Sequence, residues 1–177
     1  MTPLTQAQAA ARAATEADAA LAGLFQTQYA AMVRLAVLLG ADDAEDIVAE
    51  AFYQLYRRWK KLRGADAAVP YLRSVVCNLT RMRLRHLQVV RKHSTPDAAP
   101  QAGSSAEAEA LLHDDQRALV AALKELPARQ REALVLRHWL GLREAEIAEA
   151  MGISAGAVKS HTSRGMAALT RVLEERR

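Results

Sequence analysis

One stretch near the C-terminus, residues 142–169, constrains the fold more than any other part of the chain. Ile147 and Met151 are spaced so that one helix can lock against a second helix that crosses it. Gly152 stands where the first helix must stop, because glycine adopts positive φ at little cost. Ser154 is then placed to cap the helix that follows. The spacing is typical of a helix-turn-helix, a motif that places its second helix in the major groove of DNA.

The second helix of this motif is expected at about residues 155–171 and carries side chains suited to phosphate oxygens and base edges. These residues are Lys159, Ser160, His161, Ser163 and Arg164, with Ser154 at the cap. The alternative is an ordinary helical hairpin. The combined positions of the apolar residues, the glycine and the cap favour the DNA-binding motif over it.

Length and composition predict an all-α fold with one or two small domains. The chain has 177 residues and 51% of them are hydrophobic. Alanine supplies much of this fraction, and β-branched runs between turn signals are scarce. Cys77 is the single cysteine of the sequence, which excludes a disulfide framework, and we interpret it as a packing residue.

Several functional classes are disfavoured by what the sequence lacks. It contains no Gly-rich phosphate loop, no metal-binding cluster and no convincing nucleophile with its base, so we expect neither an enzyme nor a cofactor. No apolar run approaches the roughly 18 residues of a membrane span. No secretory signal is visible at the N-terminus. These features predict a cytoplasmic protein without membrane contact.

Charge is distributed in blocks along the chain. Residues 42–50 hold five acids and no base, whereas residues 57–92 hold eleven Lys or Arg and one acid. In the basic block, arginines alternate with apolar residues at helical spacing, which gives one packed side and one cationic side. A basic run is often only a solvated face, but this pattern favours binding of a polyanion.

The pattern predicts two small helical domains joined by a flexible linker. We expect an Ala-rich extension at residues 1–21 that is either a frayed helix or disordered, a first domain at 22–92, a linker rich in Pro, Gly and Ser at 93–109 and a second domain at 110–177. The expected helices lie at about residues 22–39, 42–62, 71–91, 110–126, 128–140 and 155–171.

The second expected helix shows both a start signal and two distinct faces. Asp42 with Glu45 resembles a capping box, and Asp43 is the alternative cap. Apolar residues at steps of three and four are expected in the core, namely Val48, Phe52, Leu55 and Trp59. The residues expected on the opposite side are Asp46, Glu50, Tyr53 and Arg57.

Together these blocks resemble the extracytoplasmic-function (ECF) sigma factors, a small two-domain class of bacterial RNA polymerase initiation factors. The resemblance is carried by residues 44–52, 70–79, 123–134, 146–154 and 157–160. It implies a protein that binds core RNA polymerase and directs promoter recognition and transcription initiation. The alternative is a stand-alone helix-turn-helix activator or repressor that does not dock on core polymerase.

The resemblance also implies three sets of binding residues. The acidic helix would dock on the largest polymerase subunit through Asp46, Ile47, Glu50, Phe52 and Tyr53. The −10 promoter element would bind as a single strand to Lys61, Arg63, Asp66, Arg73, Asn78, Arg81, Arg83 and Arg85. The −35 element would be read as a duplex by Ser154, Lys159, Ser160, His161, Ser163 and Arg164.

The partners implied are core RNA polymerase, through its largest and second-largest subunits, and promoter DNA. An anti-sigma factor is a further candidate partner. The sequence departs from the common family pattern at some positions. Met82 and Arg83 replace an Asp–aromatic pair, so we assign no strand-melting aromatic there. His161 and Thr162 replace a common Arg–Leu pair. Arg143 stands where a Ser or Thr cap is usual, so we expect that helix end to fray.

Overall fold

The computed structural model describes residues 3–62, 64–93 and 114–176, and every regular element in these ranges is helical. The α-helices are α1 (Pro3–Leu38), α2 (Ala44–Arg58), α3 (Ala68–His93), α5 (Asp114–Glu125), α6 (Ala128–Leu134), α7 (Glu144–Met151) and α8 (Ala155–Glu175). Single 3-10 turns lie at Trp59–Lys61 and Ala65–Ala67, and the π-helical turn Val135–Trp139 continues α6. The predicted all-α fold is confirmed. Of the predicted linker, all but His93 lies outside the described residues.

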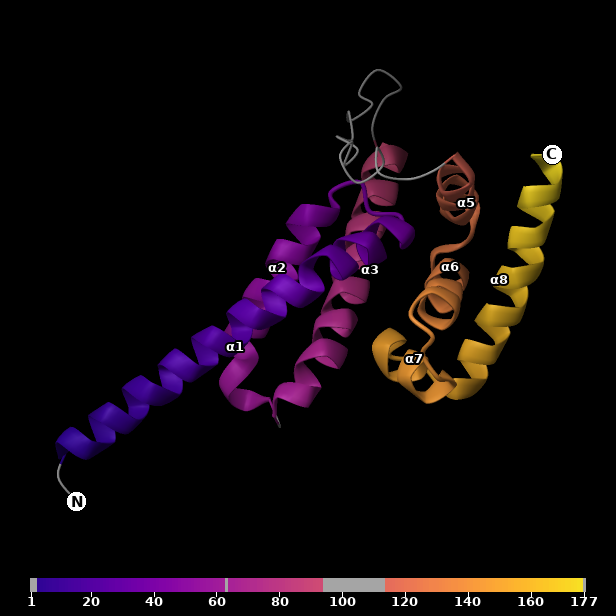
Figure 1. Ribbon diagram of the computed structural model, residues 1–177. Coiled ribbons are helices and arrows are strands. Elements are labelled where there is room, and N and C mark those ends of the chain that lie inside the picture. Colours follow the sequence, from indigo (N-terminus) through magenta and orange to yellow (C-terminus); the bar gives the residue numbers. More distant parts are fainter. Residues whose placement is uncertain (1–2, 63, 94–113, 177) are drawn as a thin grey trace.

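Helices α1, α2 and α3 pack on one another and form the first half of the molecule (Figure 1). The expected inward face of α2 is confirmed, since Val48 and Leu55 are fully buried and Phe52 is 8% exposed. Leu35 of α1 and Leu72 of α3 complete the centre of this core. The side chains that α2 turns outward are therefore the polar ones.

The Ala-rich segment at the N-terminus belongs to α1. One continuous helix runs from Pro3 to Leu38, and its first part projects from the body of the molecule (Figure 1). Alanine has the highest helix propensity, so the chain continues as helix although the side chains at residues 11–16 are exposed. The helical alternative for this segment thus agrees with the structure.

One helix of the described residues, α1, meets the length and composition of a membrane span, although polar residues interrupt its apolar stretch. Within residues 11–38, an 18-residue window of this helix has a mean hydropathy of 1.2, which is long and apolar enough for a membrane span by length and composition alone. The C-terminal part of α1 lies in the protein core, and core helices of soluble proteins meet the same criterion.

The second half consists of α5 to α8, and it contains the predicted helix-turn-helix. Ile147 and Met151 of α7 and Val158 of α8 are each at most 1% exposed, which confirms their role in locking the two helices together. Helices α6 and α8 cross very closely at Gly165. A Cβ atom at that position would lie 3.0 Å from the Gln130 carbonyl oxygen.

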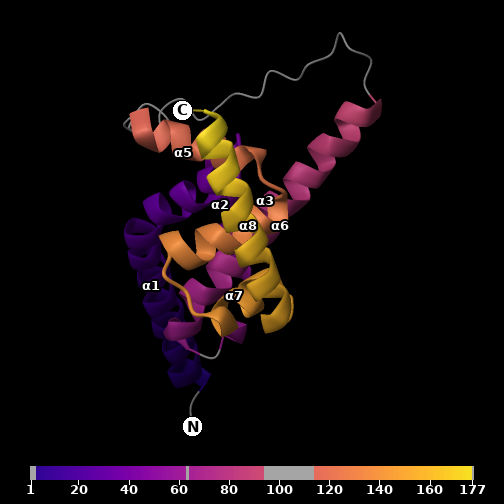
Figure 2. The same cartoon turned by 90° about the vertical axis from the view of Figure 1, so that its right-hand side faces the viewer.

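The two halves share one continuous hydrophobic core. Helix α7 packs against α3, and α5 packs against the C-terminal part of α1. Figure 2 shows α7 and α8 lying in front of the helices of the first half. The division of the chain into two separate domains stays a prediction.

Of the two alternatives for the start of α2, Asp43 and not Asp42 occupies the N-cap position, although its side chain makes no capping bond. Its carboxylate pairs instead with Arg83 at 2.6 Å. At the start of α7, the backbone N–H of Arg143 donates to Oε2 of Glu146 at 2.8 Å. This bond lowers the pKa of Glu146 and caps the helix end that we expected to fray.

We expect Gly165→Ala to destabilise the fold by about 1–3 kcal/mol, because the added methyl group forces α6 and α8 apart. Gly156→Ala is the matched control, since a Cβ at Gly156 meets nothing within 4 Å. That variant should be as stable as the wild type or slightly more stable. Thermal unfolding followed by circular dichroism measures both, and equal midpoints for the two variants would contradict the close crossing.

Candidate nucleic-acid interface

The turn of the helix-turn-helix has the geometry that the sequence predicts. Gly152 ends α7 in the left-handed region with φ of +64°. Ser154 is the N-cap of α8, and its Oγ accepts a hydrogen bond from the Ala157 backbone N–H at 3.2 Å. This bond satisfies one of the free N–H groups at the helix start. Ser154 therefore has a structural role in positioning α8.

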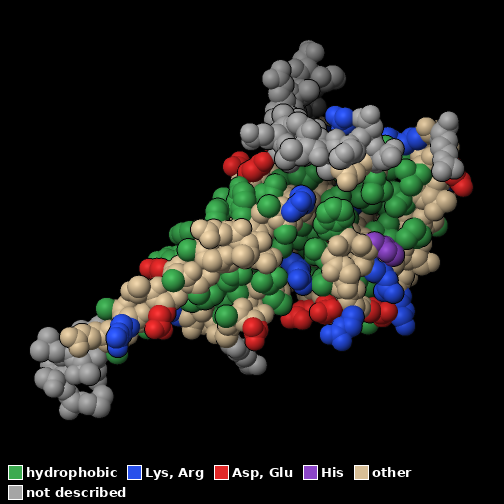
Figure 3. All heavy atoms as spheres, viewed as in Figure 1, with side chains coloured by type: hydrophobic (Ala, Val, Ile, Leu, Met, Phe, Trp, Pro, Cys, Tyr) green, Lys and Arg blue, Asp and Glu red, His purple; other side chains and the backbone are tan. Residues whose placement is uncertain are grey.

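The N-terminal part of α8 presents its polar residues to solvent. The Lys159 side chain is 74% exposed, and its only ion pair among the described residues is a loose one, 3.8 Å from Glu144. Ser160, Ser163 and Arg164 are exposed as well, while His161 is half-buried. Basic side chains gather near the start of α8, beside acidic side chains over α7 (Figure 3). Of the predicted −35 residues, Lys159, Ser160, Ser163 and Arg164 are therefore accessible on the surface of α8.

Four of the five arginines predicted for the −10 element lie on α3, and two of these four are already ion-paired. Arg83 pairs with Asp43, and its side chain remains 47% exposed. Arg81 is 17% exposed and pairs with Glu132 of α6 at 2.6 Å. Arg85 is exposed, whereas Arg73 is half-buried and its Nε has no hydrogen-bond partner among the described residues. The cationic face of α3 is thus partly covered.

The remaining −10 candidates are Asn78, which lies beside Arg81 on α3, and residues of the loop before α3. Asn78 is exposed and its Oδ1 accepts a hydrogen bond from Arg81 at 3.3 Å. Lys61 and Asp66 are exposed in the loop before α3, and Arg63 lies outside the described residues. A hollow of about 470 Å³ separates this loop from the Ala-rich part of α1.

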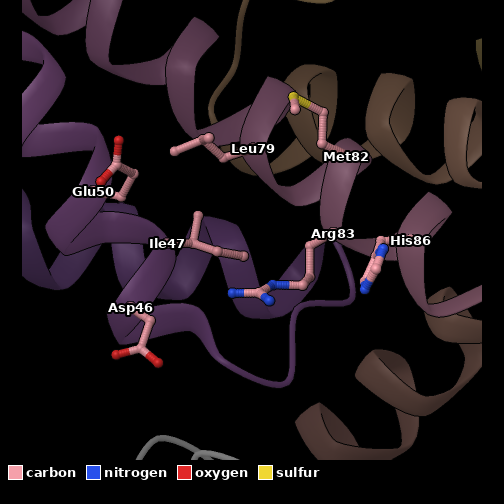
Figure 4. Close-up of a pocket in the computed structure, with 7 residues that line it drawn as sticks. All are labelled: Asp46, Ile47, Glu50, Leu79, Met82, Arg83 and His86. Atoms are coloured by element: carbon pink, nitrogen blue, oxygen red, sulfur yellow. The ribbon is translucent and has the colours of Figure 1, made fainter. Parts of the chain in front are cut away.

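The acidic face of α2 borders a hollow of about 240 Å³ (Figure 4). Asp46 and Glu50 lie on its rim and are exposed, and Tyr53 is 55% exposed. Ile47 lines the same hollow but is 4% exposed. Phe52 is turned away into the core, where its ring centroid lies 5.0 Å from that of Phe25. The surface available to a partner is therefore formed mainly by the two carboxylates and the tyrosine.

The sequence reasoning did not find an apolar hollow of about 250 Å³ where the two halves meet. Leu38 of α1 lies on one side, and Leu123, Met166 and Leu169 of the second half lie on the other. Trp139, which also lines it, is 52% exposed. Figure 3 shows hydrophobic side chains gathered across this part of the surface. These helices have ordinary apolar spacing, so the sequence did not indicate that part of their apolar surface stays exposed to solvent.

The sequence reasoning also missed two buried charges on α6. Arg131 is 5% exposed and Glu132 is 4% exposed. Arg131 donates to the carbonyl oxygens of Leu123 at 3.4 Å and Lys124 at 3.1 Å, at the end of α5. Burial lowers the pKa of Arg131, and the adjacent Glu132 opposes that effect. The only signal in the sequence was that these residues follow Pro127 in a stretch that carried the family resemblance.

Cys77 lies among these charges without taking part in their bonds. It is 1% exposed, and burial raises the pKa of its thiol far above the ordinary value, with a smaller contribution from Glu132. A thiol whose pKa is raised stays protonated at neutral pH, and the protonated form is a poor nucleophile. The structure thus agrees with a packing role.

We expect iodoacetamide to leave Cys77 unmodified in the folded protein, even in mildly alkaline buffer, and to modify it fully in denaturant. Mass spectrometry of the intact chain before and after unfolding measures the difference. Rapid modification of the native protein would show that this part of the core opens readily and that the packing role is wrong.

Comparison with known proteins places this geometry in a family. A family model described as sigma-70, region 4 matches residues 116–169. An RNA polymerase sigma-E factor of Streptomyces avermitilis is 37% identical over 156 residues, which cover 85% of this chain and 83% of the relative. The ECF RNA polymerase sigma factor SigM of Mycobacterium tuberculosis is 30% identical over 152 residues, covering 85% of this chain and 75% of the relative.

Two solved structures share the fold over both halves. The sigma factor RpoE in complex with the anti-sigma factor NepR from Bartonella quintana aligns with a TM-score of 0.64 at 24% identity, covering 86% of this chain and 96% of that one. CnrH in complex with the cytosolic domain of CnrY aligns with a TM-score of 0.63 at 21% identity, covering 94% and 95%. Similarity at this level of identity shows the arrangement of helices.

Proposed function

The chain belongs to the ECF class of RNA polymerase sigma factors, which direct transcription initiation, and on that premise we propose which of its surfaces bind polymerase and promoter. The relatives match both halves of the chain, which sets aside a stand-alone helix-turn-helix regulator. The observation that carries the proposal is the free polar face at the start of α8, held in place by the Ser154 cap and the buried contacts with α7.

We assign recognition of the −35 duplex to α8. Lys159 lies in its second turn and Arg164 about one and a half turns later, so the two side chains reach different base pairs. Arg164 is suited to a bidentate contact with a base edge. Lys159 is a compact charge on a flexible stem and is better suited to a phosphate.

We assign the −10 element to α3 and the loop before it. An unpaired strand needs a cationic groove for its backbone, and an extruded base needs donors and acceptors for its edge. The arginines of α3 supply the charge, and Asn78 supplies both an acceptor and a donor. Lys61 and Asp66 flank this surface in the loop.

We assign docking on the largest polymerase subunit to the outer face of α2. Asp46 and Glu50 are one helical turn apart and can pair with arginines of a partner, and the exposed Tyr53 ring adds apolar area beside them. The apolar hollow around Trp139 is suited to a second protein contact, which we assign to the second-largest subunit. Because the RpoE structure was determined with the anti-sigma factor NepR, we propose an anti-sigma factor as a further partner.

This role places the chain in the cytoplasm, where polymerase and promoter DNA are found. The chemistry of RNA synthesis belongs to polymerase, so we assign no catalytic residue and no cofactor to this chain. Its contribution is binding energy and the positioning of DNA.

The double variant Asp46→Lys/Glu50→Lys should bind core polymerase at least about tenfold more weakly. Each wild-type carboxylate attracts an arginine of the partner, whereas the lysine that replaces it repels that arginine. The fold should remain intact because both side chains are exposed. Glu16→Lys/Asp18→Lys makes the same change of charge on exposed positions of α1 and is the control. Affinity is measured by pull-down and by fluorescence anisotropy with core polymerase. Equal binding by the α2 variant and the wild type would refute the docking face.

Arg164→Ala should reduce transcription from the cognate promoter at least about tenfold, which corresponds to about 1.4 kcal/mol of lost contact energy. Lys159→Ala should weaken binding more evenly across sequences and reduce its salt dependence. Arg137→Ala is the control, since Arg137 is exposed outside the helix-turn-helix. Run-off transcription with reconstituted polymerase, on the cognate promoter and on −35 mutants, gives the comparison. A defect in the Arg137 variant alone would mean that the π-helical turn after α6 reads the DNA.

A further inference from the structure

One carboxylate joins the two halves by an ion pair, in addition to the hydrophobic core that they share. Glu132 of α6 is 4% exposed, and both of its oxygens accept hydrogen bonds from Arg81 of α3. Arg81 Nη2 lies 2.6 Å from Oε1, and Arg81 Nε lies 3.3 Å from Oε2. Arg129 Nη1 donates to Oε2 at 3.3 Å from within the same half. The two residues of the inter-half pair are 51 positions apart in the chain.

The geometry of this pair is the geometry with which arginine binds phosphate. Two parallel N–H groups of one guanidinium point at two oxygens of one anion, which is the fork that arginine presents to carboxylate and phosphate alike. Arg81 also donates to Asn78, and both residues belong to the surface assigned to the −10 strand. The carboxylate of Glu132 therefore occupies a position on α3 that suits an anionic oxygen of a nucleic-acid strand.

Further contacts close the second half over the same face. Helix α7 packs on α3, and the buried Nε of Arg73, which has no hydrogen-bond partner among the described residues, lies beneath this cover. At the other end of the contact, Lys124 Nζ donates to Asp42 Oδ1 at 3.2 Å. The guanidinium of Arg131 lies against Gly40, where an added Cβ would approach it to 2.9 Å. The start of α8, by contrast, remains exposed.

We infer that Glu132 is an intramolecular competitor of the promoter strand: it binds Arg81 in the free chain and holds the second half closed over the −10 face of α3. The inference rests on the proposed assignment of α3 to the −10 strand. Release of Arg81 from Glu132 frees the strand-binding face, whereas the duplex-reading face of α8 is accessible in both states. The free protein thus withholds one of its two DNA surfaces and leaves the other available.

The test compares Glu132→Gln with Glu125→Gln in the full chain. Glu125 pairs with Arg176 inside the second half, so its substitution removes the same charge without affecting the contact between the halves. Small-angle X-ray scattering without DNA measures whether the chain opens. Fluorescence anisotropy with labelled single-stranded DNA of random sequence, about 12 nucleotides long, measures access to the strand-binding face.

We expect Glu132→Gln to increase the radius of gyration and to bind the single strand about tenfold more tightly, which is the gain for a chain that is closed about 90% of the time. Glu125→Gln should change neither quantity beyond the small effect of one charge. An unchanged radius of gyration for Glu132→Gln would overturn the closed state held by this residue, whatever the DNA result. An opened chain with unchanged strand affinity would overturn the competition and count against the assignment of α3.

A second variant is needed in case Glu132→Gln does not fold, because Glu132 also binds Arg129 within its own half. Asp42→Asn removes the ion pair with Lys124 at the other end of the contact and leaves Glu132 untouched. Circular dichroism establishes that each variant is folded. If Glu132→Gln does not fold, Asp42→Asn should show the same two changes at smaller size, and no change in either quantity would overturn the inference.

Discussion

Two adjacent charges on one turn of α6 hold the elements of this molecule together. The guanidinium of Arg131 binds the carbonyl groups at the end of α5, and the carboxylate of Glu132 binds α3. Arg129, which also binds Glu132, donates to the carbonyl oxygen of Met151 at 3.0 Å and so holds the end of α7. Burial of ions is costly unless each is paired and hydrogen-bonded. Loss of one partner would leave the other charge buried and uncompensated, at a cost of about 3–5 kcal/mol in measured cases.

The helices and the contacts between the two halves depend on different kinds of interaction. Each helix of the second half has its own end signal, such as the Ser154 cap and the left-handed Gly152, and these depend only on neighbouring residues. The placement of α3 against α6 and α7 depends instead on side chains far apart in sequence. A structure of this kind can keep its helices while the contact between its halves changes, because the two levels rest on different interactions.

The sequence predicted the features that depend on neighbouring residues and missed those that depend on residues far apart in the chain. The helix-turn-helix, its cap and the inward face of α2 could be predicted because each depends on spacing within a few residues. The sequence did not predict that Arg81 and Arg83 are ion-paired, because their partners on α6 and before α2 are revealed only by tertiary packing. Phe52 was expected in the core from its spacing and on the docking face from the resemblance. The structure buries it, and its ring packs against those of Phe25 and Tyr29.

Helix α8 is much longer than the part that faces DNA. Its 21 residues extend over about 30 Å at 1.5 Å per residue, and its far end is tied to α5 by the pair between Arg176 and Glu125. Near the middle, Gly165 lets the backbone approach α6 too closely for α8 to slide. The same rigid helix therefore connects the DNA-reading end, through the crossing at Gly165, to the end of α5.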